Sequence, residues 1–403
     1  MNAMYIGSFD PFTSGHLNVV SRALAKHVIT LKNGQFKPTQ YLKYDKLIIC
    51  VGKNEAKTPM FSTQERLEFI ELAIQELPRA EDIIVISSDD LTVNIARQNN
   101  VSALIRGIRS EMDMQNELSL AETNRFLAAE QGFELTTDFF TQEDEFKKTI
   151  SSSLVRKLLK MEQYTAACRC LPLGIAQKVI ASQLEERFCK GFTSPFFYSK
   201  DNCNKIIKAY LARPYHNLLH LAYMFDMLKL YLKQSDPREQ PDWLESLEIA
   251  ILLHDYVYET AQPEAEPYYN ETASVGFVTS MTKEFMCYRH LNLPLISSLI
   301  MATTHDDAYL AKTPEAEEPC QVIADLDLSI LGTADSASWK NYTAGIRKEY
   351  AAYSDEKYTK GRLAFLSSLL QKEQIFHTKF FNKMLEKQAR ENIKNEIARL
   401  QQG

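Results

Sequence analysis

The spacing of hydrophobic and polar residues changes character near the middle of the chain. Over residues 1–160, short apolar runs alternate with stretches of helical periodicity. The apolar runs predict four buried strands, at Ala3–Gly7, Lys46–Gly52, Ile83–Ser87 and Val101–Ile105. The stretches between them predict helices at Leu17–Lys26, Thr63–Leu77 and Leu91–Asn99. Such alternation is typical of an α/β fold, a doubly wound parallel sheet with helices on both faces.

From about residue 185 onward, helical periodicity dominates and strand candidates are few, which predicts an all-α second half. A helical run ends in the segment 185–200, where Gly191, Ser194 and Pro195 follow. We therefore expect two domains, 1–184 and 185–403, with a short join. The polar segment Lys32–Tyr44 predicts an insertion between the first helix and the second strand.

Composition narrows the classes of function. The chain has 403 residues, of which 45% are hydrophobic and 24% charged, an ordinary globular balance. Its net charge of −6 argues against general nucleic-acid binding, which needs many basic side chains. No apolar run approaches the roughly 18 residues of a membrane-spanning helix, and no charged segment typical of a signal peptide opens the chain. Seven scattered cysteines fit reduced thiols, so we expect a cytoplasmic protein without a membrane partner.

The first predicted strand ends in a glycine-containing turn that leads into a helix. In open α/β sheets ligands bind beyond the carboxyl ends of the strands, and a helix N-terminus offers N–H groups to a phosphate. Gly7 and Gly15 allow close approach of the backbone, and His16 can donate a hydrogen bond to a phosphoryl oxygen. An ordinary glycine turn that happens to carry a histidine would look the same.

A second phosphate-binding pattern lies far downstream, in Ile150-Ser151-Ser152-Ser153-Leu154-Val155-Arg156. These hydroxyl and N–H groups suit the β- and γ-phosphates of a nucleoside triphosphate. A serine-rich N-cap explains one serine better than three serines followed by Arg156. Together, T-x-G-H at Thr13–His16 and I-S-S-S-x-x-R resemble the nucleotidylyltransferase superfamily.

Further motifs narrow this resemblance. The strings Leu104–Arg109, Asp113–Glu117 with Asn124-Arg125, and Lys57–Ser62 with Glu65-Arg66 resemble phosphopantetheine adenylyltransferase, over residues 1 to about 180. The resemblance implies a Rossmann-like fold and transfer of the adenylyl group of ATP to 4′-phosphopantetheine, giving dephospho-coenzyme A and pyrophosphate. The acceptor phosphate would attack the α-phosphorus in line, so the protein would act through positioning and charge stabilisation.

The same resemblance implies the roles of individual residues. His16 and Lys57 would be catalytic, and the acceptor would be bound by Ser8, Lys57, Thr92 and Arg106. ATP would be bound by Gly7, Ser8, Phe9, His16, Arg106, Gly107, Arg109, Glu117, Ser151, Ser152, Ser153 and Arg156. It further implies Mg²⁺ with ATP, feedback binding of coenzyme A and a homo-oligomer, which the helical half or the insertion could alter.

Two departures from the family pattern are visible. Lys57-Thr58 replaces a pair of lysines, and Ser8 stands where threonine is common. An alternative is another nucleotidylyltransferase, one that uses nicotinamide mononucleotide or is a cytidylyltransferase. Arg106-Gly107-x-Arg109 together with Glu117 disfavours it.

Five of the eight histidines lie within one segment of the helical half: His216, His220, His254, His290 and His305. The first two are four residues apart and so share one face of a helix. His254-Asp255 ends an apolar helix, and Asp325 and Asp327 lie on a third helical stretch. Histidines and carboxylates on separate helices are what a divalent-metal site in a helical core requires.

The strings Y-H-N-x-x-H, H-D-x-V-Y, Asn270-Glu271 and D-x-D-L-x-I-L-G resemble the HD superfamily of metal-dependent phosphohydrolases, as does Arg347-x-Glu349-Tyr350. The resemblance runs from about residue 195 to the end and leaves the substrate open. It implies a metal, Mn²⁺, Mg²⁺ or Fe²⁺, that would lower the pKa of bound water. The ligands would be His220, His254, Asp255 and Asp325, with His216 as general acid.

Other residues of the helical half are weaker candidates. Glu271 and His305 would bind a second metal or the substrate phosphate, although Tyr269 occupies a position that is often acidic in the family. For His27, His290 and His377 we expect structural roles.

The sequence therefore predicts a bifunctional enzyme, whose hydrolase would act on a nucleotide or a coenzyme A-related phosphate. The alternative is a helical half that binds metal and nucleotide without turnover, as a regulatory or oligomerisation module.

Overall fold

The computed structural model divides the chain into two compact units, Met1–Val179 and Ile180–Gly403. This division and the boundary predicted after residue 184 both lie within helix α8 (Leu173–Gly191). The described backbone covers residues 1–29, 39–52, 58–75, 77–109, 111–141, 149–191, 200–234, 241–260, 267–284, 291–310 and 314–402. Lys57 and part of the predicted insertion lie outside these residues.

A five-stranded parallel sheet forms the centre of the first unit, in the order β5-β4-β1-β6-β7. Its strands are β1 (Asn2–Gly7), β4 (Lys46–Gly52), β5 (Ile83–Ser88), β6 (Val101–Ile108) and β7 (Thr136–Thr141). The central strands are buried on both faces, which explains their continuous apolar runs. The four predicted strands and the doubly wound fold class are confirmed, whereas β7 was not predicted.

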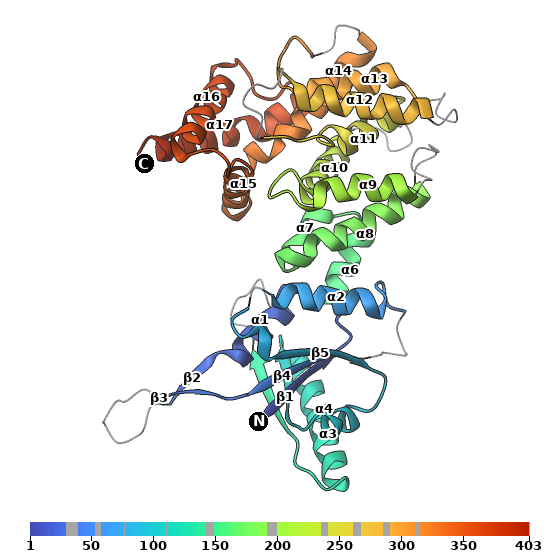
Figure 1. The fold of residues 1–403 in the computed structure, drawn as a ribbon, viewed down its shortest axis with the longest axis vertical. Coiled ribbons are helices and arrows are strands. Elements are labelled where there is room, and N and C mark those ends of the chain that lie inside the picture. Colours follow the sequence, from blue (N-terminus) through green and yellow to red (C-terminus); the bar gives the residue numbers. More distant parts are fainter. Residues whose placement is uncertain are drawn as a thin grey trace. The chain divides into compact units, whose positions relative to one another are not determined.

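Helices cover both faces of this sheet, α1 and α2 on one side and α3 and α4 on the other (Figure 1). Their bounds are α1 (Ser14–Leu24), α2 (Thr63–Ile74), α3 (Thr92–Gln98) and α4 (Glu111–Glu130). Ser62 and Glu65 form a capping box at the start of α2, which fixes where that helix begins. The short helix η1 (Ala80–Asp82) lies between α2 and β5. After β7 the unit continues with α6 (Ser152–Lys160), α7 (Tyr164–Arg169) and the first part of α8.

Where a polar insertion was expected, the described residues contain an antiparallel ribbon. Strand β2 (Lys26–Ile29) pairs with β3 (Thr39–Leu42), and the ribbon extends away from the five-stranded sheet (Figure 1). The helical pattern at Leu17–Lys26 therefore gives way to a strand at its C-terminal end.

The described residues of the second unit form only helices, as predicted. They are α9 (Lys200–Leu211), α10 (Leu218–Leu232), α11 (Leu244–Leu253), α12 (Tyr269–Glu284), α13 (Leu293–Ala302), α14 (Pro314–Leu328), η4 (Ser329–Gly332), α15 (Ser336–Glu349), α16 (Asp355–Gln371) and α17 (Lys379–Gln401). Helix α11 is apolar around its circumference and packs against α10, α13 and α14. A helix of that composition belongs in a core, and its end brings His254 to the centre of the unit.

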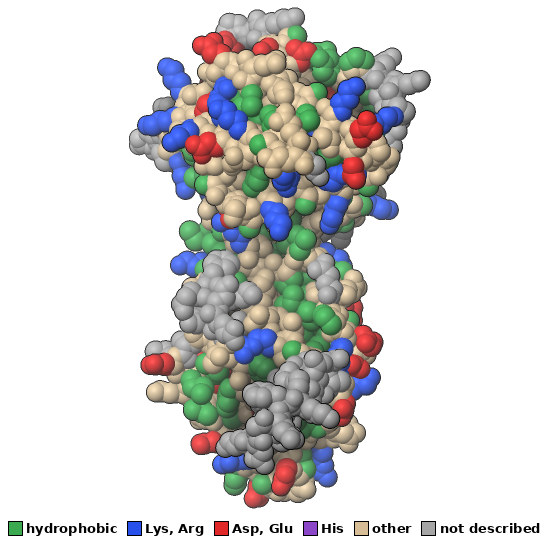
Figure 2. Space-filling view, turned by 90° about the vertical axis from the view of Figure 1, so that its left-hand side faces the viewer, with side chains coloured by type: hydrophobic (Ala, Val, Ile, Leu, Met, Phe, Trp, Pro, Cys, Tyr) green, Lys and Arg blue, Asp and Glu red, His purple; other side chains and the backbone are tan. Residues whose placement is uncertain are grey.

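Two observations concern the apolar length of the helices and the charges at the surface. No helix among the described residues is long and apolar enough to cross a membrane. On the face of the helical unit seen in Figure 2, basic and acidic side chains are interspersed. That mixture agrees with the absence of a strongly basic composition.

Candidate functional sites

The cavity of the first unit lies where the strand order of the sheet reverses. The chain runs from β1 outward to β4 and β5, then returns to β6 beside β1. Ligands of open α/β sheets bind beyond the carboxyl ends of the strands at such a point. A cavity of about 570 Å³ opens there, between Gly7 at the end of β1, Arg106 on β6 and the first turns of α1 and α6.

The first turn of α1 orients His16. Thr13 is the N-cap of the helix, and its backbone N–H donates to Nδ1 of His16 at 3.0 Å. Since Nδ1 accepts, the proton of the neutral imidazole is on Nε2, which can donate to a ligand in the cavity. Burial, assisted by the charge of Arg109, lowers the pKa of His16 to about 3. His16 is therefore a neutral hydrogen-bond donor at pH 7.

The serines at the start of α6 have separate local partners. Ser151 is the N-cap and accepts from Leu154 N at 3.1 Å, while Ser152 Oγ donates to Pro11 O at 2.9 Å. Arg156 donates to Ser153 Oγ at 3.1 Å. The hydroxyls of Ser151 and Ser152 thus hold the helix in place. What α6 offers to a phosphate is its first-turn N–H groups and the positive end of its dipole.

Two arginines stand at the carboxyl end of β6. Arg106 donates to Ile6 O at 3.1 Å, and its Nε lies 3.3 Å from Glu117 Oε2. Arg109 donates from Nε to Asp113 Oδ2 at 2.9 Å. An arginine carries five N–H donors, so both guanidinium groups have donors left for an anionic ligand. Because both arginines are ion-paired, what they offer a ligand on this side of the cavity is directed N–H donors.

Sequence analysis assigned no role to two residues that shape the cavity. Arg66 on α2 is buried and donates to the carbonyl oxygen of Ser8 at 2.8 Å. The buried carboxylate of Asp10 accepts from the backbone N–H groups of Met60 at 3.0 Å and Phe61 at 2.9 Å. These contacts join segments at least fifty residues apart in the chain, which no local pattern signals.

The structure brings most of the predicted nucleotide-binding residues together. Those lining the cavity are Gly7, Ser8, Phe9, His16, Arg106, Gly107, Arg109, Glu117, Ser151, Ser152, Ser153 and Arg156. Thr92, predicted to bind the acceptor, is the first residue of α3 and is not among the residues lining the cavity. Lys57 lies outside the described residues.

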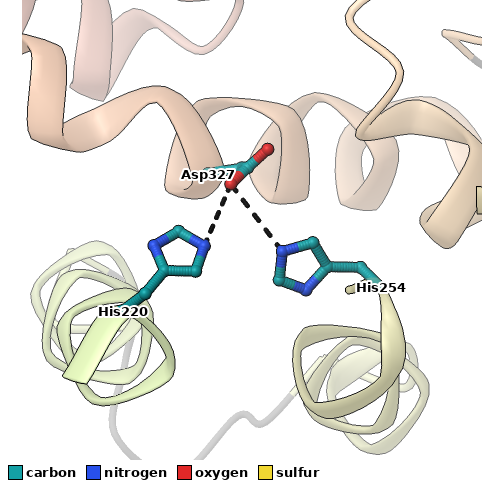
Figure 3. A group of neighbouring side chains, drawn as sticks. All are labelled: His220, His254 and Asp327. Atoms are coloured by element: carbon teal, nitrogen blue, oxygen red, sulfur yellow. Dashed lines mark ion pairs between the residues drawn. The ribbon is translucent and has the colours of Figure 1, made fainter. Parts of the chain in front are cut away.

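In the second unit, side chains from three parts of the helical core converge. His220 on α10 and His254 at the end of α11 point toward Asp327 on α14 (Figure 3). Their Nε2 atoms lie 3.1 and 3.7 Å from Asp327 Oδ1. One candidate ligand atom from each residue lies within 4.8 Å of the others. Two imidazoles and a carboxylate are a suitable donor set for a divalent transition metal.

Asp255 completes this cluster, with Oδ2 3.0 Å from His254 Nε2 and 4.0 Å from His220 Nε2. The Nε2 atoms of both histidines and Asp255 Oδ2 are buried without a hydrogen-bond partner among the described residues. His254 Nδ1 donates to Ile251 O at 2.9 Å, which leaves a lone pair on Nε2 of the neutral ring. Buried polar atoms are rarely left unpaired, so these residues fit a metal ion.

The charges of the cluster also favour a cation. Although burial alone would lower it, the carboxylates of Asp255 and Asp327 raise the pKa of His254 well above its usual value. Burial would raise the pKa of Asp327, yet the imidazoles of His220, His254 and His305 hold it well below its usual range. The two carboxylates therefore stabilise positive charge at this point.

Asp325, which was predicted to be a metal ligand, does not lie in this cluster. Its carboxylate accepts from His377 N at 2.7 Å, Thr378 N at 2.8 Å and Thr378 Oγ1 at 2.7 Å, and so holds the start of α17. Residues two apart on an α-helix point in directions about 200° apart. Asp325 and Asp327 therefore face opposite sides of α14, and only Asp327 faces the histidines.

A buried carboxylate orients His216. Glu349 at the end of α15 accepts from Tyr215 N at 2.8 Å and His216 N at 2.7 Å, and its other oxygen lies 2.7 Å from His216 Nδ1. A Cβ on Gly345 would come within 2.9 Å of Tyr215 Cβ, so glycine lets α15 approach this closely. Burial alone would lower the pKa of His216, but Asp255 and Glu349 raise it. His216 Nε2 is left for the cavity.

The weaker candidates of the helical half lie at the same site. A cavity of about 500 Å³ is lined by His216, Asp255, Glu271, His305 and Asp327. His305 Nε2 lies 2.9 Å from Asp327 Oδ2.

Three histidines were expected to have structural roles, and one of them, His377, is described and lies outside this cluster. The backbone of His377 donates to Asp325, and burial lowers the pKa of its imidazole. The side chains of His27 and His290 lie outside the described part of the chain.

The known proteins that are similar to this chain match its N-terminal part. The profile of the cytidylyltransferase-like family matches residues 37–158. A phosphopantetheine adenylyltransferase of Synechococcus elongatus is 40% identical over 160 residues, which are 40% of this chain and 81% of the relative. The protein of that name from Desulforamulus reducens is 29% identical over 188 residues, 47% of this chain and 97% of the relative. The one from Lachnoclostridium phytofermentans is 36% identical over 155 residues, 38% and 80% of the two chains.

Proposed function

Because the chain belongs to the phosphopantetheine adenylyltransferase family through its N-terminal unit, we propose that it transfers the adenylyl group of ATP to 4′-phosphopantetheine. An oxygen of the acceptor phosphate attacks the α-phosphorus. The bond from that phosphorus to the oxygen bridging the β-phosphate breaks, and pyrophosphate leaves. We expect Mg²⁺ to accompany ATP.

The orientation of His16 carries this proposal. The neutral imidazole held by Thr13 presents Nε2–H to the cavity, where it can donate to a non-bridging oxygen as negative charge grows on the α-phosphate. Arg106 and Arg109 supply further N–H donors on the β6 side. The first turn of α6 supplies N–H groups for the outer phosphates of ATP. Binding and orientation of the two phosphates supply the remaining rate enhancement.

Pyrophosphate release from ATP and 4′-phosphopantetheine by the purified chain tests this function. We expect activity with this pair and a loss of about 10²–10³ in kcat for His16→Ala, the size typical of one transition-state donor. Nicotinamide mononucleotide as acceptor and CTP as donor serve as the alternative substrates. Turnover with either, but not with 4′-phosphopantetheine and ATP, would overturn the assignment.

For the second unit we propose a metal-dependent phosphohydrolase. The supporting observation is the group of buried atoms on His220, His254 and Asp255 that lack a hydrogen-bond partner among the described residues, beside the carboxylate of Asp327. These four residues would hold a divalent cation, which when bound would polarise a phosphate and lower the pKa of water.

The surrounding residues fit the proton transfers of hydrolysis. Water would bond to phosphorus and lose a proton to solvent as the ester P–O bond breaks. The leaving oxygen would take a proton from His216, which would regain one from solvent. Glu349 holds His216 through Nδ1 and stabilises its protonated form, as a general acid requires. His305, fixed by Asp327, and Glu271 lie where the phosphate oxygens or a second cation would be.

Phosphate release with Mn²⁺, Mg²⁺ or Fe²⁺ tests this second function. The panel comprises nucleotides, pyrophosphate, dephospho-coenzyme A and 4′-phosphopantetheine, with Asp255→Ala as the control. Turnover that is lost in the control supports a second enzyme. Metal binding without turnover of any compound would favour a regulatory module instead.

A further inference from the structure

The cavity of the helical unit has two ends of different chemistry. Among the described residues that line it, the acidic ones are Asp255, Glu271 and Asp327, which lie with His216 around the proposed metal site. The residues contributed by α15, by α16 and by the turn joining them include no carboxylate. A substrate whose phosphate lies at the acidic end therefore extends the rest of its body toward α15 and α16.

That second end is lined mainly by aromatic rings. Tyr342, Tyr350, Tyr353, Tyr358 and Phe365 all border the cavity. The ring centroid of Tyr350 lies 5.9 Å from that of Tyr353 and 6.1 Å from that of Tyr358. Phe365 is 36% exposed although it is large and apolar. Partly exposed rings that border one cavity are a surface on which another planar ring can stack.

The charges at this end are positive. Arg362 borders the cavity but is neutralised by the buried Glu396, whose Oε1 lies 2.9 Å from its Nε. Lys357 is exposed, lines the cavity and has no ion pair with a described residue. One uncompensated positive charge therefore lies beside the aromatic rings, where it favours an anionic ligand.

Resting on the phosphohydrolase function proposed above, we propose that the helical unit takes a nucleoside phosphate, whose base stacks among the tyrosines of α15 and α16. Hydrolysis would place the oxygen of water on phosphorus, with the proton lost by that water passing to solvent, and would release the nucleoside with the proton from His216 on its freed oxygen. The cavity of about 500 Å³ is within the range of pockets that enclose small ligands.

Other phosphate compounds use this cavity less well. Pyrophosphate, sugar phosphates and 4′-phosphopantetheine have no planar ring, so they leave the aromatic surface exposed to water. A base that stacks on an aromatic side chain gains binding energy whatever hydrogen-bond donors and acceptors its edge carries. The proposal therefore concerns nucleotides as a class and makes no choice among the bases.

Kinetics on the full chain test the proposal, with guanosine monophosphate and ribose 5-phosphate as paired substrates in the presence of Mn²⁺. Tyr353→Leu removes one ring, and Tyr353→Phe is the matched control that keeps it. Binding of guanosine monophosphate is measured in parallel by calorimetry without added metal. Both variants retain an identical N-terminal unit, so differences between them report on the helical one.

We expect guanosine monophosphate to have the lower KM. Tyr353→Leu should raise this KM and the dissociation constant about tenfold or more, with kcat and the constants for ribose 5-phosphate little changed. Tyr353→Phe should resemble the natural chain. Tyr358→Leu provides a second variant if the first does not fold.

The failures of the two proposals differ. Equal KM values for the two substrates, or equal effects of Tyr353→Leu on both, would overturn the nucleotide assignment and leave the hydrolase standing. Ring-dependent binding of guanosine monophosphate without phosphate release would uphold the nucleotide site and overturn hydrolysis. If guanosine monophosphate is neither bound nor hydrolysed, both proposals would be overturned.

Discussion

Two aspartates on one helix give the sharpest prediction. Asp327 faces His220 and His254, whereas Asp325 accepts three hydrogen bonds at the start of α17. Replacement of each by alanine should therefore damage different properties. Asp327→Ala should weaken metal binding, and Asp325→Ala should lower the free energy of unfolding while metal binding persists.

The magnitudes follow from these contacts. At a metal concentration of 100 times the dissociation constant, binding stabilises the folded unit by about 2.7 kcal/mol, and a 100-fold loss of affinity reduces this to about 0.4 kcal/mol. Asp325→Ala leaves the N–H groups of His377 and Thr378 without their acceptor. At about 1–3 kcal/mol for each buried unsatisfied group, we expect a loss of about 2–6 kcal/mol.

Urea unfolding followed by far-ultraviolet circular dichroism, with and without Mn²⁺, measures both effects. The Asp327→Ala chain should show little metal-induced shift of the midpoint. The Asp325→Ala chain should unfold at lower urea and keep the full shift. The opposite result, with the metal-induced shift lost in Asp325→Ala and kept in Asp327→Ala, would refute the assignment of the ligands.

Three further predictions concern residues away from this pair. Since the folded pKa of His16 is about 3 and the unfolded one about 6.5, the unfolded chain takes up the proton first, so stability falls as pH drops below 6.5. Between pH 7 and pH 5, the free energy of unfolding should therefore fall by about 1–2 kcal/mol less in His16→Gln than in the natural chain. Urea unfolding at the two pH values measures this, and an equal fall in both chains would contradict it. Glu349→Gln should lower kcat of phosphate release about tenfold to a hundredfold with metal affinity unchanged, and a parallel loss of metal would argue against a role in orienting His216. Arg66→Met should raise KM for 4′-phosphopantetheine, because the loop carrying Ser8 loses its support; steady-state pyrophosphate release would check it, and an unaltered KM would exclude this role.

The elements of the sheet could be predicted because buried parallel strands are continuous apolar runs. β1, β4, β5 and β6 begin and end within a few residues of their expected limits. The strand β7 escaped prediction because four of the six residues of Thr136–Thr141 are polar and the strand is only partly buried. The β2–β3 ribbon escaped it as well, since its first strand continues directly from a helical pattern.

The candidate sites were less predictable than the fold, for a geometric reason. The string D-x-D at residues 325–327 offers two identical side chains, and only the rotation of α14 about its axis decides which one meets the histidines. Glu349 reaches His216 across 133 residues of sequence, and Arg66 reaches Ser8 across 58. Contacts at such separations depend on how helices pack, which hydrophobic periodicity does not specify.

The surroundings of the metal cluster favour chemistry over a purely structural role. A structural metal site is closed by protein ligands, whereas a catalytic one keeps a position open to a ligand or water. Asp255 and Asp327 line a cavity of about 500 Å³, so a cation held by them would face that cavity. At the same cavity, both oxygens of Glu349 are used to fix one imidazole, that of His216. A module that only bound a metal would have no use for an oriented, readily protonated group beside it, and this arrangement is why hydrolysis accounts for the site better than regulation does.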